Sequence, residues 1–160
     1  MSFSLRKATL EDEEFLCAVY SNTRADEMAL TGWDDAQQEL FLKMQFITQQ
    51  RFYRMQDPEP DQQVILLGGE PVGRLVVIKT EGEVRLVDIA LLPAFREAGV
   101  GTLVIRQLLE EAAEAAKPVR LQVERTNHAA RLYERLGFVR IGETDTHFQM
   151  EWRRQDNDKG

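Results

Sequence analysis

Cysteine and histidine are scarce in this chain, which has one cysteine and two histidines among 160 residues. An internal disulfide needs two cysteines, so none can form. The apolar neighbours of Cys17 indicate a small buried side chain rather than a nucleophile. His128 and His147 lie far apart in the sequence without cysteine partners, so we expect no metal site. These scarcities argue against disulfide-stabilised and zinc-dependent classes of protein.

Long apolar runs and basic clusters are missing as well. No window approaches the ~20 apolar residues that span a bilayer, and residues 1–7 contain no run of signal-peptide length. We therefore expect a soluble, cytoplasmic protein without a membrane partner. The net charge is −7, the pI is about 5.0, and no basic patch stands out, so we expect no nucleic-acid partner. The acidic balance would modestly attract cationic substrates such as amines.

The length and composition favour one domain of ordinary size. The 160 residues, 43% of them hydrophobic, can bury about two-thirds of their unfolded surface in one core, and no internal repeat or low-complexity linker interrupts them. We predict a single domain over residues 1–152. Residues 153–160 are rich in charge, and we expect them to form a disordered tail.

Hydrophobic periodicity and capping signals predict a mixed α/β sheet. Thr9 and Asp12 form a near capping box, Asp34 can cap a second helix, and two prolines follow that helix after about Met55. The strands in the middle of the chain are apolar on both faces, as in a sheet covered by helices. The predicted elements are strand 3–7, helices 9–20 and 34–55, strands 64–67, 72–79 and 84–92, helix 99–116, strand 118–124, helix 129–136, and strands 138–141 and 147–152.

A glycine-containing loop follows the strand that ends near Leu92. Gly99 and Gly101 let the backbone adopt positive φ or approach a ligand closely, and they expose N–H groups at the start of a helix, where a pyrophosphate would fit. The alternative is that Gly-x-Gly makes only a tight turn. A Walker loop is disfavoured because no lysine follows Gly101, and a dinucleotide-binding unit because the third glycine is missing.

The loop and a second segment together resemble a known family. Arg96-x-x-Gly99-x-Gly101, preceded by Ile89-Ala90-Leu91-Leu92-Pro93, looks like the acetyl-CoA signature of the GNAT superfamily of N-acetyltransferases. The closing segment of that family is similar to Leu121-x-Val123-Glu124-x-x-Asn127-x-x-Ala130-x-Leu132-Tyr133-Glu134-x-Leu136-Gly137-Phe138. The resemblance covers roughly residues 2–152.

The resemblance implies a GNAT-like fold, in which a mostly antiparallel twisted sheet is splayed between strands 4 and 5 and flanked by about four helices. Acetyl-CoA would lie in that gap as cosubstrate, with no metal. The strand end would pair with the pantetheine arm, and the amides of residues 97–102 would hold the pyrophosphate. The cofactor-binding residues implied are Ile89, Ala90, Leu91, Arg96, Glu97, Ala98, Gly99, Val100, Gly101, Thr102, Asn127 and Tyr133.

The implied reaction is attack of a primary amine on the thioester in a ternary complex. Tyr133 would give a proton to the departing thiolate; the alternative is that its ring only packs against neighbouring leucines. Asp88 interrupts an apolar strand, and burial there would raise the pKa of its carboxyl into the range of a general base. Alternatively, Asp88 pairs with backbone or an arginine, or ordered water takes the proton. The other base candidates are Glu83, Glu124, Asp26 and Glu27.

Acceptor specificity in this family comes from the first two helices and their connection, here residues 24–33. Glu27 and Trp33 are the predicted substrate-binding residues, through carboxylate and cation–π contacts with a small-molecule or peptide amine. The terminal strands could also pair across a two-fold axis in a homodimer. Two other functions stay open: a catalytically degenerate acyl-CoA-binding sensor or scaffold, and a nucleotide-binding or protein-interaction module that uses the same loop.

Overall fold

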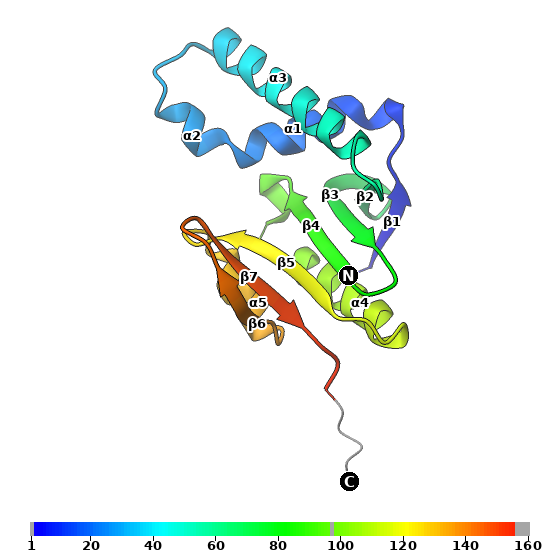
Figure 1. Cartoon of the computed structure of the whole chain (residues 1–160). Coiled ribbons are helices and arrows are strands. Elements are labelled where there is room, and N and C mark those ends of the chain that lie inside the picture. Colours follow the sequence, from blue (N-terminus) through cyan, green and yellow to red (C-terminus); the bar gives the residue numbers. More distant parts are fainter. Residues whose placement is uncertain (1, 97, 156–160) are drawn as a thin grey trace. The chain divides into compact units, whose positions relative to one another are not determined.

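The computed structural model of this chain describes residues 2–96 and 98–155, and these residues form two compact units (Figure 1). The N-terminal unit comprises Met1–Val76 and Asp88–Gly101, and the C-terminal unit comprises Val77–Val87 and Thr102–Gly160. Strands β3 (Glu70–Lys79) and β4 (Val84–Leu91) contribute residues to both units. The single domain over 1–152 stays a prediction, and residues 156–160 of the predicted tail lie outside the described part of the chain.

The described strands form one seven-stranded sheet in the order β1-β2-β3-β4-β5-β7-β6. In the N-terminal unit, β1 (Phe3–Lys7) pairs antiparallel with β2 (Asp61–Leu67), from Phe3↔Leu67 to Lys7↔Gln63. In the C-terminal unit, β5 (Val119–Glu124) pairs antiparallel with β7 (His147–Trp152), which pairs antiparallel with β6 (Val139–Glu143). The predicted mixed α/β sheet is confirmed.

One pairing in the C-terminal unit is parallel. The register of β4 with β5 runs from Val84↔Val119 to Leu86↔Leu121, so it includes only the first three residues of β4. The β5 to β7 register, by comparison, includes all six residues of β5. A short parallel ladder is what a sheet that opens between strands 4 and 5 requires. The opening itself stays a prediction.

The first helices begin where the capping signals predicted. Asp12 Oδ2 accepts a hydrogen bond from the Thr9 amide at 2.8 Å. Each carboxylate oxygen of Asp12 also accepts a hydrogen bond from a guanidinium nitrogen of Arg6, both at 2.8 Å. These bonds, with that of Arg6 the strongest, lower the pKa of Asp12 to about 2. A 3₁₀ turn, Leu10–Asp12, then leads into α1 (Glu13–Thr23). Asp34 caps α3 (Asp35–Arg54) by accepting the Gln37 amide at 2.8 Å.

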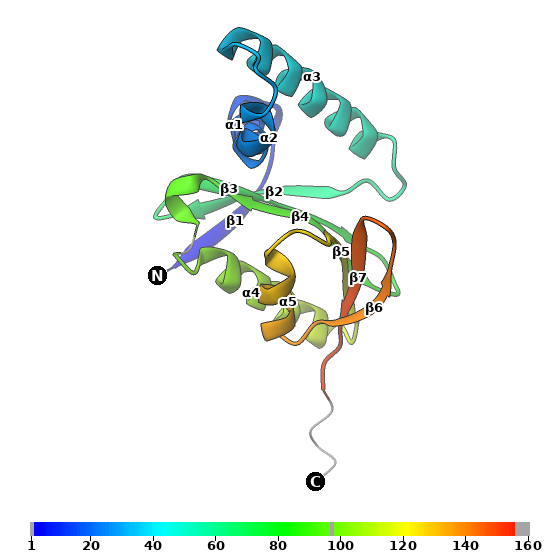
Figure 2. The ribbon, with the colours of Figure 1, turned by 90° about the vertical axis from the view of Figure 1, so that its left-hand side faces the viewer.

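The structure adds a short helix that periodicity did not predict, so the described residues contain five α-helices rather than four. This helix, α2 (Ala25–Ala29), has five residues, too few to show a helical repeat in the sequence. Its Met28 side chain is buried in a cluster shared by α1, α3 and β2. That cluster consists of Leu16, Tyr20, Met28, Leu42, Phe46 and Val64, and Figure 2 shows the three helices on one side of β1 and β2.

Two turns differ from the prediction for reasons of backbone geometry. Gly68 and Gly69 have φ values of +59° and +84°, which suit a two-residue hairpin turn, so β3 already begins at Glu70. Helix α4 (Val100–Glu114) ends two residues earlier than predicted, and Ala116 adopts φ of +57° after it. A left-handed residue commonly ends a helix, although glycine usually fills that position.

The C-terminal unit is held together by apolar packing and a charged cross-strand group. Ile105 of α4, Val119 of β5 and Met150 of β7 are almost fully buried. Arg120 of β5 donates to Glu83 and to Glu151 of β7, each at 2.8 Å. Helix α5 (Ala129–Arg135) follows β5 in the chain. No helix among the described residues has both the length and the apolar content to cross a bilayer.

Candidate functional site

The carboxyl end of β4 lies unusually close to β3 in the N-terminal unit. A Cβ atom at Gly73 of β3 would collide with the Ala90 carbonyl oxygen and would lie 2.7 Å from Leu91 Cδ2. Only glycine permits this approach without a shift of backbone. The Leu92 amide donates to the Val72 carbonyl at 2.9 Å, which holds the end of β4 in place. Gly73 therefore shapes the predicted Ile89–Leu91 segment, and sequence patterning did not single it out.

The predicted loop begins with a hydrogen bond between Arg96 and the end of β4. After a 3₁₀ turn, Pro93–Phe95, Arg96 Nε donates to the Leu91 carbonyl at 3.0 Å. The Arg96 side chain is exposed, and among the described residues its two terminal nitrogens make no hydrogen bond. The guanidinium therefore fixes the loop through one nitrogen and keeps two donors for an anion. Glu97, also a predicted contact, lies outside the described residues.

The second half of the loop has the backbone geometry expected of a phosphate cradle. Gly99 has φ of +83°, and a Cβ placed there would meet nothing within 4 Å, so the space beside the loop is open. Ala98 is exposed, whereas Val100 is fully buried and starts α4. Gly101 is less constrained, because a Cβ there would lie 3.7 Å from Leu91 Cδ1, an ordinary contact. Gly99 is thus the residue that needs to be glycine.

Helix α4 supplies the electrostatic part of this cradle. The first N–H groups of a helix have no intrahelical acceptor, and the aligned peptide dipoles of a 15-residue helix place positive charge at that end. Thr102, the third residue of α4, is half-buried. Among the described residues, no group of three or more His, Cys, Asp or Glu side chains could hold a metal ion. Binding of an anion by the backbone amides of the loop and the helix start stays a prediction.

Asp88 of β4 forms an ion pair with a buried arginine of β3. Arg74 Nε donates to Asp88 Oδ2 at 2.9 Å, and Arg74 Nη2 lies 2.7 Å from the same oxygen. The Arg74 side chain is 3% exposed and that of Asp88 is 33% exposed. Arg74 Nη1 is buried without a hydrogen-bond partner, and no described residue donates to Asp88 Oδ1. The arginine partner considered from sequence is therefore present, while one carboxylate oxygen stays available.

Tyr53 of α3 lies near this pair. Burial raises the pKa of Tyr53 to about 12, with smaller electrostatic effects of opposite sign from Arg74 and Asp88. From the sequence, Tyr53 was one of several aromatic residues that could bind an amine, with packing on the core face of the helix as the alternative. A buried arginine could not be inferred from the pattern, because arginine is rarely buried and β3 also carries charged residues at its two ends.

The predicted tyrosine and asparagine belong to the C-terminal unit. Tyr133 of α5 is 8% exposed, and its ring packs edge-on against Phe138 at a centroid distance of 5.5 Å. Asn127 is exposed, and its Oδ1 accepts the Ala129 amide at 2.8 Å, which shapes the start of α5. Its Nδ2 donates to no described residue and is available to a ligand. The catalytic role of Tyr133 and the ligand contact of Asn127 stay predictions.

The other acidic candidates differ in their partners. Glu83 is engaged by Arg85 at 3.1 Å and Arg120 at 2.8 Å, and these arginines lower the pKa of its carboxyl despite partial burial. Glu27 pairs with Arg24 at 3.2 Å. Asp26 and Glu124 are exposed. Glu83 is therefore committed to a structural ion pair.

The predicted site residues fall into two groups. Asp88, Ile89–Leu91, Arg96 and Ala98–Gly101 lie together in the N-terminal unit, which also carries Glu27 and Trp33. The C-terminal unit carries Thr102, Asn127 and Tyr133. Each group is positioned by its own unit. That the two groups form one site stays a prediction.

The end of β4, the open loop at Gly99 and the start of α4 follow one another in the chain, as the motif predicted, and anion binding there stays a prediction. The sequence model of the acetyltransferase (GNAT) family matches residues 14–138, which is most of the chain. The chain therefore belongs to the acetyltransferase (GNAT) family, and the resemblance inferred from the motifs is confirmed. No curated protein sequence matches it significantly.

Solved structures share the fold. PaiA N-acetyltransferase from Thermoplasma acidophilum, in complex with coenzyme A, is 19% identical with a TM-score of 0.72, covering 96% of this chain and 100% of that one. Ard1 from Thermoplasma volcanium is 25% identical with a TM-score of 0.63, covering 98% and 100%. An acetyltransferase from Thermus thermophilus is 18% identical with a TM-score of 0.70, covering 96% and 98%. The predicted GNAT-like fold class is thus confirmed.

Proposed function

We propose that this chain is an N-acetyltransferase that transfers the acetyl group of acetyl-CoA to a primary amine of a small molecule or peptide. Family membership supports acyl transfer. The observation that carries the proposal is the loop before α4, where Gly99 has φ of +83° beside open space and the two terminal nitrogens of Arg96 make no hydrogen bond to a described residue. Such a loop suits the pyrophosphate of an acyl-CoA rather than a neutral ligand.

The cosubstrate follows from the same geometry. The solved PaiA structure contains coenzyme A, and its fold resembles that of this chain, which supports the choice. When bound, acetyl-CoA supplies the acetyl group as a reactive thioester. The residues proposed to hold it are Ile89, Ala90, Leu91, Arg96, Glu97, Ala98, Gly99, Val100, Gly101, Thr102 and Asn127, together with Tyr133. No metal takes part in this proposal.

In the proposed reaction, the neutral amine nitrogen attacks the thioester carbonyl carbon and forms the C–N bond. The C–S bond then breaks, the sulfur takes a proton, and the nitrogen loses one, giving an acetamide and free CoA. Tyr133 is proposed to donate the proton to sulfur. Asp88 is proposed to accept the amine proton through Oδ1, directly or through water, because Arg74 occupies only Oδ2.

Ligand-dependent thermal unfolding tests the cofactor. A ligand at a hundredfold excess over its Kd stabilises the native state by about 2.7 kcal/mol. We expect acetyl-CoA and CoA, but not ATP or NAD, to raise the Tm. Gly99→Glu should remove this shift, because its carboxylate repels the pyrophosphate. Gly69→Glu is the matched control, since Gly69 has φ of +84° and equally open surroundings. A shift with ATP or NAD alone would support a nucleotide-binding module instead.

Thiol release with a panel of primary amines tests turnover. Tyr133→Phe should lower kcat at least tenfold while leaving the acetyl-CoA Kd unchanged, because the ring packing against Phe138 is retained. Equal loss of affinity and turnover would make the hydroxyl a binding group. CoA binding without acetylation of any amine would mean that the chain is a degenerate sensor or scaffold.

A further inference from the structure

Helix α3 has two apolar faces, and the chain itself covers only one of them. The inner face holds the buried side chains of Leu42, Phe46 and Tyr53. The opposite face, which we call the outer face of α3, carries six large apolar side chains that are 36–85% exposed. These are Leu40, Phe41, Met44, Ile47, Phe52 and Met55. At 3.6 residues per turn, the six fall within one arc of about 140°, and a helix that is apolar on both sides is normally enclosed.

Exposed apolar side chains gather around this helix instead of scattering over the described residues. The outer face, together with Leu30 and Trp33, holds eight of the eleven large apolar side chains that are exposed in the described part of the chain. Trp33 extends the outer face, because its ring packs edge-on against Phe41 at a centroid distance of 5.1 Å. Single exposed apolar residues are ordinary on a protein surface, whereas a contiguous patch indicates an interaction surface.

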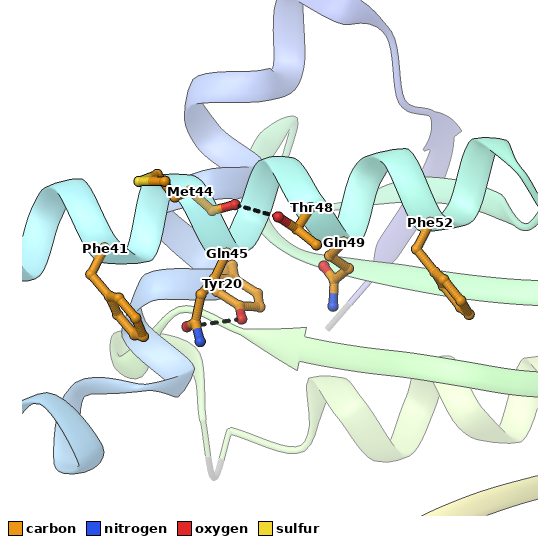
Figure 3. A pocket seen from close by; sticks show the side chains of 7 residues that line it. All are labelled: Tyr20, Phe41, Met44, Gln45, Thr48, Gln49 and Phe52. Atoms are coloured by element: carbon orange, nitrogen blue, oxygen red, sulfur yellow. Dashed lines mark hydrogen bonds between the residues drawn. The ribbon is translucent and has the colours of Figure 1, made fainter.

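A hollow on this surface is free of charged side chains. Figure 3 shows Phe41 and Phe52 pointing to the same side of α3, about three helical turns apart. With Tyr20 of α1, they line an open pocket of about 470 Å³ whose lining contains no ionisable acid or base of the Asp, Glu, Lys, Arg or His type. Apolar side chains of a partner can fill this pocket without the cost of removing an ion from water.

Two charged side chains belong to the outer face, one near each end. Arg51 lies within the arc, in the last turn of α3, and Asp34 lies at the edge of the arc, at the N-cap. Both side chains are exposed, and neither forms an ion pair with a described residue. The other charged residues of the helix, such as Glu39 and Lys43, fall outside the arc. The outer face therefore has an acidic end and a basic end.

A second copy of α3, antiparallel to the first, complements this distribution. Asp34 of each chain then lies beside the partner's Arg51, so the same ion pair forms twice. The point midway between Asp34 and Arg51 along the helix is also midway between Phe41 and Met44. One register therefore pairs the charges and brings the apolar side chains together, whereas a parallel pair would place like charges and helix dipoles side by side.

We infer that the outer face of α3 is the interface of a homodimer, in which two copies of α3 pack antiparallel about a two-fold axis. This surface differs from the terminal strands, for which the sequence suggested two-fold pairing. The inference does not depend on the proposed function, because it uses no residue of the glycine loop. A membrane surface suits the patch less well, since the net charge of −7 repels anionic lipid.

Sedimentation equilibrium of the full chain over a range of concentrations tests the interface. We expect a mass of twice the 18.4 kDa of one chain at high concentration. Met44→Glu should raise the dimer Kd roughly a hundredfold, because it buries two carboxylates near the two-fold axis. Val139→Glu is the matched control: Val139 is 59% exposed, against 60% for Met44, but lies on β6, so the Kd should not change. A monomer at every concentration, or loss of the dimer in Val139→Glu alone, would overturn the inference.

A charge reversal tests the antiparallel orientation. Arg51→Glu faces the partner's Asp34 and should raise the dimer Kd about tenfold. Adding Asp34→Asn should recover part of this loss, because asparagine ends the repulsion and still caps the helix. Lys43→Glu makes the same charge change outside the arc and should leave the Kd unchanged, and circular dichroism checks that each variant is folded.

Two outcomes contradict this arrangement. An effect of Arg51→Glu no larger than that of Lys43→Glu, or no recovery with Asp34→Asn, would rule out the antiparallel pair. An unaltered chain that stays monomeric and sediments with phosphatidylcholine vesicles would identify a membrane as the occupant of the outer face instead.

Discussion

In the ion pair between Arg74 and Asp88, the arginine is far more buried than the aspartate. This difference predicts that removing the carboxylate destabilises the protein more than removing the guanidinium. Asp88→Asn would leave the Arg74 guanidinium, only 3% exposed, without its counter-ion. Removing one partner of a buried pair typically costs about 3–5 kcal/mol. Arg74 Nη1 already lacks a hydrogen-bond partner among the described residues, so no second acceptor is recorded for the guanidinium there. We expect Asp88→Asn to lower the free energy of unfolding by about 3 kcal/mol.

The opposite substitution should be much milder. Arg74→Met would leave the Asp88 carboxylate, which is 33% exposed and can be hydrated, while methionine fills most of the space of the arginine stem. We expect a loss of about 1 kcal/mol. The double variant should be more stable than Asp88→Asn alone, because it removes the uncompensated buried charge.

Urea unfolding of the three variants, followed by circular dichroism, measures these differences. Losses from Asp88→Asn and Arg74→Met that are equal, or a larger loss from Arg74→Met, would refute the reasoning from burial.

Three further predictions concern the backbone and two titrating groups. Gly73→Ala should weaken acetyl-CoA binding at least tenfold, because the added methyl group displaces the end of β4. Gly82→Ala is the control and should leave binding unchanged, because the space around Gly82 is open. Isothermal titration with acetyl-CoA measures the Kd of both variants. The carboxyl of Asp12 has a folded-state pKa of about 2, below its unfolded value, so its contribution to stability is present above about pH 4 and is lost as the pH falls to 2; Asp12→Asn should flatten this part of a stability–pH curve. The phenol of Tyr53, with a pKa raised to about 12, should ionise above the usual tyrosine value of about 10 in an absorbance titration. The stability that it contributes is lost between about pH 10 and 12, and Tyr53→Phe should remove that transition.

Local signals accounted for most of the secondary structure. The caps at Thr9 and Asp34 act within three or four residues, so they can be read without knowing the fold, and both helices begin beside them. Strand β7 has the predicted bounds, His147–Trp152. Helix α2 was missed because its five residues hold only one buried apolar side chain, Met28, which leaves no periodicity to detect.

In the candidate site, too, the residues set by local sequence were predicted, and those set by contacts between strands were not. Gly99 was identified because its place before a helix is a property of neighbouring residues, and the structure gives it φ of +83°. Gly73 was not identified, because its constraint comes from β4, 17 residues away in the chain at Ala90. The identity of the arginine that pairs with Asp88 could not be predicted either, because Arg74 becomes its neighbour only when two strands lie side by side.

The sequence by itself determined the family, the order of the elements except α2, and the position of the glycine loop, because each depends on residue types at short, fixed spacings. The tertiary structure decided which charges are paired, which glycine is sterically required and where an aromatic pocket forms. Those properties arise from contacts between residues distant in the chain. Asp88 is the clearest case: the sequence left its partner open between backbone and an arginine, and the fold pairs it with Arg74 of the neighbouring strand.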